Sequence, residues 1–192
     1  MKPYQFLLFV FCLFLPAGVS GKEDSQLRAA YDLIARVTPG YETQFELELI
    51  GQVDGKDAYE IMPGDGKVVL KGNNAVSIAT AFNHYLKYTC HAHVSWLGDQ
   101  LDLPERLPMP SPVKNTIQGK YRVYMNYCTV SYSAAWWDWE RWQREIDYMA
   151  MNSINMPLSV VGLEAVWYNT LLKHKFSDEE ARRFLAGPGH SA

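Results

Sequence analysis

The sequence predicts a small α+β domain followed by the first strand–helix–strand–helix of a (β/α)8 TIM barrel. The first observation is that residues 121–128 and 154–160 alternate between apolar and polar side chains, as half-buried strands do. The second is that the segment between them repeats its apolar residues at helical spacing. A strand, a helix and a strand in this order form a right-handed unit with parallel strands. A parallel strand with one polar face indicates a barrel whose second face looks into a polar mouth.

The α+β domain is expected over residues 22–104. Its elements are, in chain order, a helix over Ser25–Val37, a strand over Phe45–Leu49, a hairpin of Ala58–Met62 and Lys67–Lys71, and a second helix reaching Leu86. The first strand is half-buried because its apolar residues alternate with Glu46 and Glu48. The hairpin turns at Pro63-Gly64-Asp65-Gly66, and Asn73 is the expected N-cap of the second helix.

A Pro-rich linker is predicted over residues 105–118, because four prolines and little periodicity mark the stretch from residue 102 to residue 118. Residues 119–192 then form an incomplete barrel, since a whole (β/α)8 barrel needs about 250 residues. The apolar stripe of its first helix consists of Trp139, Trp142, Ile146 and Met149. The pairs Glu140/Arg144 and Arg141/Glu145 are expected on the solvated outer face of that helix. Two further helices are expected, one over Leu163–Lys173 and one capped by Ser177.

Residues 1–21 have the order of a signal peptide, with Lys2, the apolar run Phe6–Leu15 and then small residues. The run is too short to span a bilayer, so we expect cleavage after Ser20 or Gly21 and export without a membrane anchor to the periplasm or the extracellular space. The net charge of −3 and the charged fraction of 20% indicate no basic surface for nucleic acid or for an anionic membrane.

A longer series of residues resembles a known enzyme family. The series is Asn126-Tyr127-Cys128-Thr129, Ser131-Tyr132-Ser133, Trp136-Trp137-Asp138-Trp139, Arg141-Trp142, Arg144-Glu145-Ile146-Asp147, Met149-Ala150, Asn152, Ile154-Asn155, Gly162, Glu164-Ala165 and Trp167. It is similar to the α-N-acetylglucosaminidases of glycoside hydrolase family 89. Upstream, Tyr85-Leu86, Cys90 and His93-Val94-Ser95-Trp96 resemble the end of that family's small N-terminal domain.

The resemblance implies an exported retaining glycosidase that removes terminal α-linked N-acetylglucosamine from glycans, with two catalytic glutamates and no cofactor. In the family both glutamates lie on later barrel strands, so no catalytic residue is expected within this chain, and the chain alone is expected to be inactive. Asn126 and Cys128 match substrate-side positions. We expect both on the polar face of the first barrel strand, near its carboxyl end. The alternatives for Cys128 are a small buried filler or a disulfide with Cys90.

Trp136 and Glu164 are two further candidate substrate residues. Trp136 is expected near the mouth, where an indole either stacks on the apolar side of a pyranose or packs in the core. Glu164 either approaches the mouth or is an acid of the first helical turn. His91 and His93 share one strand face with no third ligand nearby, so no metal site is expected.

The family has Asn-Gly where Asn152-Ser153 stands, so one of these two residues must end the helix without the freedom of glycine at positive φ. The alternative function is a non-catalytic exported carbohydrate-binding or structural module, in which the tryptophans form a platform.

Overall fold

The computed structural model describes residues 20–158 and 162–186 of the chain. The chain forms two compact units, the first reaching residue 120 and including residues 150–153, and the second made of residues 121–149 and those from 154 onward. The predicted signal peptide lies outside the described residues except for Ser20 and Gly21, which begin the first helix. Within the described ranges, no helix has both the length and the apolarity to cross a bilayer.

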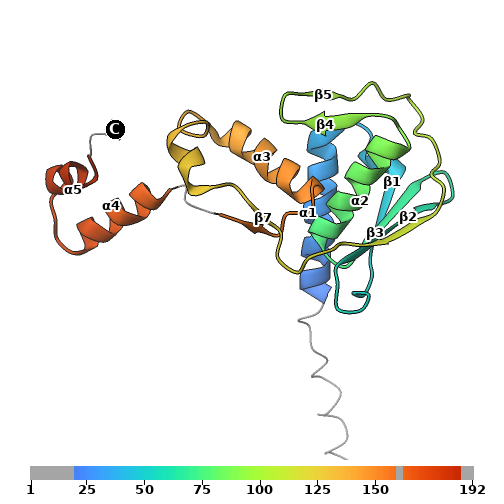
Figure 1. Ribbon diagram of the computed structural model, residues 1–192, viewed down its shortest axis with the longest axis horizontal. Coiled ribbons are helices and arrows are strands. Elements are labelled where there is room, and N and C mark those ends of the chain that lie inside the picture. The colour runs from blue at the N-terminus through green and yellow to red at the C-terminus, as the bar shows by residue number, and fades with distance from the viewer. Residues whose placement is uncertain (1–19, 159–161, 187–192) are drawn as a thin grey trace, which may run out of the picture. The chain divides into compact units, whose positions relative to one another are not determined.

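The first unit is an α+β fold in which two helices pack on a four-stranded sheet (Figure 1). The strands are β1 (Phe45–Leu49), β2 (Ala58–Pro63), β3 (Val68–Gly72) and β6 (Val113–Thr116), in the order β1-β3-β2-β6. The helices are α1 (Ser20–Val37) and α2 (Ala75–Tyr88). A 3-10 turn η1 (Glu42–Gln44) precedes β1, and β4 (His93–Ser95) pairs with β5 (Gly98–Gln100) in a separate two-stranded sheet. The predicted helices, first strand and hairpin are confirmed.

The core of this unit lies between the sheet and the two helices. Phe45 of β1 makes edge-on ring contacts with Phe82 and Tyr85 of α2, with centroids 5.4 Å and 5.8 Å apart. All three side chains are buried. The end of β3 touches the start of α2 so closely that a Cβ at Gly72 would lie 2.6 Å from the backbone nitrogen of Ile78. Glycine at this position therefore allows the strand and the helix to meet.

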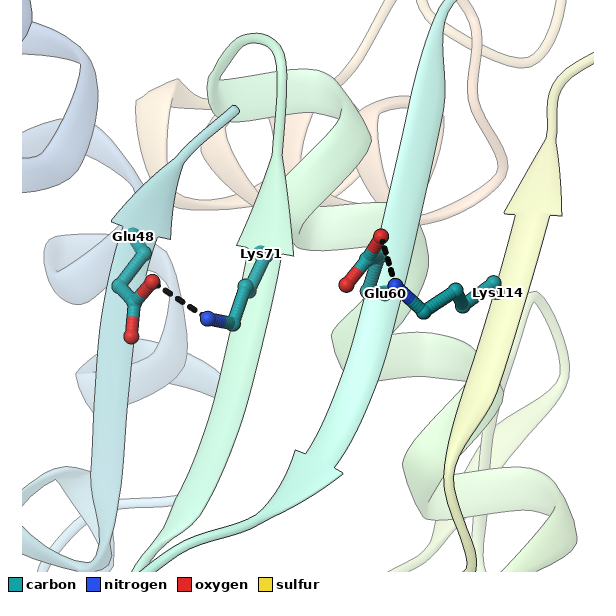
Figure 2. Close-up of polar contacts among 4 residues, drawn as sticks. All are labelled: Glu48, Glu60, Lys71 and Lys114. Atoms are coloured by element: carbon teal, nitrogen blue, oxygen red, sulfur yellow. Dashed lines mark hydrogen bonds and ion pairs between the residues drawn. The ribbon is translucent and has the colours of Figure 1, made fainter. Parts of the chain in front are cut away.

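The opposite face of the sheet carries a row of alternating charges, Glu48, Lys71, Glu60 and Lys114, paired in register across the four strands (Figure 2). Three of them alternate along their strands with buried core residues: Leu47, Leu70 and Ile61. Lys71 Nζ lies 2.6 Å from Glu48 Oε2. Lys114 Nζ lies 2.9 Å from Glu60 Oε1. Each such pair contributes only about 0.2–1 kcal/mol, so the row mainly favours this strand register over others.

The stretch predicted as a linker is part of this sheet. Val113–Thr116 forms the edge strand β6, antiparallel to β2. Leu107 is buried in the core, and its backbone N–H donates to Gln44 Oε1 at 3.0 Å. The prolines indicate an extended backbone, but prolines also suit the approach to an edge strand, where fewer ladder hydrogen bonds are needed. The sequence therefore predicts the extended backbone and misses its pairing.

The N-cap of α2 is Asn74 rather than the predicted Asn73. The carboxamide oxygen of Asn74 accepts a hydrogen bond from the Ser77 N–H at 2.9 Å. Asn73 Oδ1 instead accepts from the Ala58 N–H at 2.9 Å and from the Ser77 hydroxyl at 2.8 Å. The prediction was wrong by one residue because Asn73 ties the start of the helix to β2.

The second unit contains the predicted parallel strand pair with a helix between the strands in sequence. β7 (Val123–Tyr124) pairs in parallel with β8 (Met156–Pro157), and α3 (Trp139–Met151) connects them. β7 is shorter than predicted, because the backbone turns at Met125, with φ +69°, and then forms the 3-10 helix η2 (Tyr127–Ser131). β8 begins two residues later than predicted. Residues 159 and 160 of the predicted second strand lie outside the described residues. The described part of the chain holds no closed barrel.

Helix ends in the second half of the chain follow the sequence signals. After α3, Ser153 takes the positive φ, +62°, where the family resemblance implies glycine. α4 (Leu163–Lys173) lies at its predicted residues, and α5 (Asp178–Leu185) has the predicted N-cap Ser177. Ser177 Oγ accepts from the Glu180 N–H at 3.2 Å while Glu180 Oε2 accepts from the Ser177 N–H at 2.8 Å, which is a capping box.

Candidate active site

The carboxyl ends of β7 and β8 lie at the same edge because the two strands are parallel. The Leu158 N–H donates to the Tyr124 carbonyl at 3.0 Å, so the ladder continues past the end of β8. Asn126 and η2 follow directly after β7. In a barrel, substrates bind at this edge of the strands. We therefore take the residues that follow it as the candidate active site.

Asn126 is exposed and caps η2 with its side chain. Its Oδ1 accepts hydrogen bonds from the Cys128 N–H at 2.8 Å and from the Thr129 hydroxyl at 3.3 Å. Its amide NH2 group donates to none of the residues that the structure describes. The two hydrogen bonds to Oδ1 hold the Asn126 carboxamide in place and leave its NH2 group able to donate to a ligand.

The polar face predicted for the first strand is wrong for Tyr124. The Tyr124 hydroxyl hydrogen-bonds to Glu145 of α3, so this side chain faces the helix and not a mouth. Val123, which was expected on the apolar face, is 62% exposed. The positive φ of Met125 then breaks the alternation, so the face on which Asn126 lies cannot be inferred from that of Tyr124. Asn126 and Cys128 stay candidates because they follow the end of the strand.

Cys128 is half-buried and free, as is Cys90. A disulfide between them would join the two units, and this alternative stays a prediction. Burial raises the pKa of the Cys90 thiol, and the hydrogen bond of the thiol with Tyr85 partly offsets this rise. Burial of the Tyr85 phenol raises its pKa, with a smaller contribution from Cys90. Cys90 is thus a packed thiol of the first unit, and Cys128 alone remains a site candidate.

Trp136 is 89% exposed in this chain, so its side chain is open to a ligand here, and its role in sugar binding stays a prediction. The next residue, Trp137, contacts the Trp142 ring at 4.8 Å. Of the predicted apolar stripe of α3, Met149 is buried, whereas Trp139 and Ile146 are exposed in this chain. The stripe is therefore buried only in part in this chain, and packing of Trp139 and Ile146 stays a prediction for the complete barrel.

Glu164 lies in the first turn of α4, after Gly162 with φ +79°, and is exposed. An acid in this position is favoured by the helix dipole. Across the described residues, no hydrogen bond or ion pair joins Glu164 to Asn126, Cys128 or Trp136. The structure therefore agrees with the first-turn alternative and leaves approach to the mouth as a prediction.

A buried carboxylate that the sequence did not reveal lies near the site. Glu145 was expected on a solvated face, but its side chain is 0% exposed while its ion pair with Arg141 is formed at 2.9 Å. Burial raises the pKa of Tyr124, and the hydrogen bond and negative charge of Glu145 raise it further. Arg141 also stacks on Trp137, with Cζ 3.9 Å from the ring centre. The i,i+4 spacing predicts the ion pair, but not that its carboxylate is buried.

No metal site is formed by the residues that can be described, since nowhere among them do three His, Cys, Asp or Glu side chains gather. His93 lies on β4, while His91 precedes the strand at φ +54°. The two histidines therefore do not share one strand face, so that part of the prediction is wrong.

Comparison with known proteins places this geometry in a family. The family model described as "Alpha-N-acetylglucosaminidase (NAGLU) N-terminal domain" matches residues 28–109. The family model described as "Alpha-N-acetylglucosaminidase (NAGLU) tim-barrel domain" matches residues 122–192. The alpha-N-acetylglucosaminidase of Homo sapiens is 37% identical over 181 residues, which are 91% of this chain and 24% of the human protein. The chain thus spans about a quarter of the length of the curated relative that it matches.

Solved structures agree. A family 89 glycoside hydrolase from Clostridium perfringens, in complex with 2-acetamido-1,2-dideoxynojirmycin, has a TM-score of 0.79 and 32% identity, covering 94% of this chain and 20% of that one. A doubly substituted form of such a hydrolase from the same organism, in complex with its substrate GlcNAc-alpha-1,4-galactose, gives the same TM-score of 0.79. Both domain matches, the human relative and the solved structures agree. The chain therefore belongs to the α-N-acetylglucosaminidase family, glycoside hydrolase family 89, and corresponds to the N-terminal portion of its members.

Proposed function

We propose that this chain is the N-terminal part of an exported retaining glycosidase that removes terminal α-linked N-acetylglucosamine from glycans. The observation that carries the proposal is that the family likeness runs through the candidate site. The match to the barrel domain begins at residue 122 and so includes Asn126, Cys128, Trp136 and Glu164. The substrate complex of the Clostridium perfringens hydrolase supports an α-linked N-acetylglucosaminide as the substrate class.

In this proposal the chain binds and orients the sugar, and the rest of the protein supplies the two carboxylates. Retention requires two carboxyl groups about 5–5.5 Å apart, one protonating the glycosidic oxygen while the other attacks the anomeric carbon. Water then releases the sugar from the second group with the first acting as base. The Asn126 amide NH2 group donates to a sugar hydroxyl, and Trp136 stacks on the apolar side of the ring.

Turnover of an aryl α-N-acetylglucosaminide by the complete gene product tests the proposal. We expect release of the phenol from the α-anomer and none above background from the β-anomer, which serves as the matched control. The 192-residue chain alone should release none, because neither of the two catalytic glutamates is expected within it. Binding of N-acetylglucosamine by the complete protein without any turnover would favour the alternative of a non-catalytic carbohydrate-binding module.

A further inference from the structure

Four side chains of the second unit form a continuous series of contacts from β7 to the segment that carries Trp136. The Tyr124 hydroxyl hydrogen-bonds to Glu145, and Glu145 Oε2 accepts from Arg141 Nη2 at 2.9 Å. The guanidinium of Arg141 then lies over the ring of Trp137, at 3.9 Å. We call Tyr124, Glu145, Arg141 and Trp137 the Glu145 network.

The burial of this network distinguishes it from an ordinary ion pair on a helix surface. The side chain of Glu145 is 0% exposed and that of Arg141 is 29% exposed. The Arg182–Asp178 pair of α5 has the same i,i+4 spacing and the same 2.9 Å distance, with side chains 65% and 61% exposed. A buried carboxylate is costly unless its partners stay in place, so the positions of Arg141 and Tyr124 are tightly coupled to Glu145.

The segment between β7 and α3 is connected to the network at one end and to Asn126 at the other. The Trp137 N–H donates to the Ala134 carbonyl at 3.2 Å, and the Ala134 N–H donates to the Thr129 carbonyl at 2.9 Å. The Thr129 hydroxyl donates in turn to the Asn126 carbonyl at 2.9 Å. Trp137 is therefore linked through these hydrogen bonds to the segment that contains its exposed neighbour Trp136 and begins at Asn126.

We propose that Glu145 is a positioning residue of the sugar site: through Arg141 it holds Trp137, and so sets the segment 127–138 in the arrangement in which Trp136 and Asn126 meet the sugar. This inference rests on the proposed function and adds a residue that does not itself touch the sugar. Tyr124 attaches the same carboxylate to the strand that ends at the site.

Kinetics of the complete enzyme separate positioning from a merely structural role. Glu145→Gln keeps the shape of the side chain and removes the charge that Arg141 pairs with. Because stacking and hydrogen bonding to the sugar act in both the ground state and the transition state, we expect KM to rise about 10-fold or more while kcat changes by less than about threefold. A merely structural role would instead lower the fraction of active enzyme, so kcat would fall at unchanged KM.

Two further variants and a control make the test independent of any one substitution. Arg141→Lys keeps the positive charge and loses the planar stack on Trp137, and Tyr124→Phe removes only the phenol. Both should raise KM in the same direction as Glu145→Gln. Asp178→Asn breaks the matched exposed pair, so KM and kcat should stay at wild-type values.

Hydrogen exchange of residues 127–138 in the complete protein provides a readout besides activity. We expect faster exchange in this segment for Glu145→Gln and Arg141→Lys, and unchanged exchange for Asp178→Asn. A wild-type enzyme without turnover would refute the proposed function. The exchange measurement would still test whether the Glu145 network holds residues 127–138 in place. Wild-type KM together with wild-type exchange in Glu145→Gln and Arg141→Lys would overturn the inference, as would a fall in kcat at constant KM. If Glu145→Gln does not fold, Arg141→Lys and Tyr124→Phe decide by the same criteria.

Discussion

Asn126 combines a local cap with a proposed sugar contact, and two substitutions separate these roles. Asn126→Ala removes the acceptor for the Cys128 N–H and the donor for the sugar, so we expect a stability loss of about 0.5–2 kcal/mol and a kcat/KM about 10- to 100-fold lower. Asn126→Asp keeps the acceptor and removes the donor. Its stability should be close to wild type while kcat/KM still falls. Wild-type kcat/KM in Asn126→Asp would remove Asn126 from the sugar site.

His84 is expected to make the first unit less stable as the pH falls. Burial lowers the pKa of His84, whose Nδ1 lies 2.8 Å from the Tyr59 hydroxyl, which also accepts from Asn115. An unfolded histidine titrates near a pKa of about 6.5, so below this pH the unfolded chain binds a proton that the folded chain binds less readily. The free energy of unfolding should therefore decrease as the pH drops from about 7.5 to about 5.

The variant His84→Gln serves as the comparison for this pH dependence. Glutamine keeps an acceptor for Tyr59 and does not titrate, so urea unfolding of the first unit should depend less on pH in the variant. Equal slopes of unfolding free energy against pH in the two proteins would show that His84 is not responsible.

At the scale of elements, signals carried by a few neighbouring residues predict structure well. The capping box at Ser177 and the helix over Leu163–Lys173 lie where the sequence placed them, because caps and helical periodicity are local. Signals that depend on a distant partner do not reveal that partner. The pairing of Val113–Thr116 with β2 and the burial of Glu145 could be seen only in the structure.

The strand that leads to the site shows a second physical limit. Alternation of apolar and polar residues gives two faces, but Tyr124 is amphipathic and suits either one. The turn at Met125 requires a positive φ, which residues other than glycine rarely adopt. A methionine at this position therefore gave no sequence signal for the turn. The site could therefore be placed at the end of this strand, while the orientation of its residues could not be predicted.

The end of α4 offers a test of backbone strain. Lys175 has φ +67°, and the bonds from the Lys175 N–H to Leu172 and from the Phe176 N–H to Leu171 form the pattern in which glycine is preferred at this position. Lys175→Gly should stabilise the last turn of α4 by about 0.5–1 kcal/mol, the relief of strain being partly offset by a more flexible unfolded chain.

Native-state hydrogen exchange of the last turn of α4 in the complete protein measures this effect. Lys175→Ala is the matched control, because it removes the same side chain and keeps the strained φ. Equal exchange rates in the glycine and alanine variants would show that strain at Lys175 is negligible.

For the molecule as a whole, export is the first consequence of the proposal that can be measured. The order of charge, apolar run and small residues in residues 1–21 predicts a mature protein that begins near Lys22. Mass spectrometry of the exported fraction should find this terminus. An exported protein that still carries Met1 would contradict cleavage, and absence from the exported fraction would contradict export.

The central claim is that the complete protein is a retaining glycosidase for terminal α-linked N-acetylglucosamine. Proton NMR of the anomeric signals during the first minutes of hydrolysis tests it most directly, because retention releases the α-anomer of the free sugar before mutarotation produces the β-anomer. We predict that the α-anomer of N-acetylglucosamine appears first. The β-anomer appearing first would contradict retention, and the absence of any released sugar would contradict the assignment as a glycosidase.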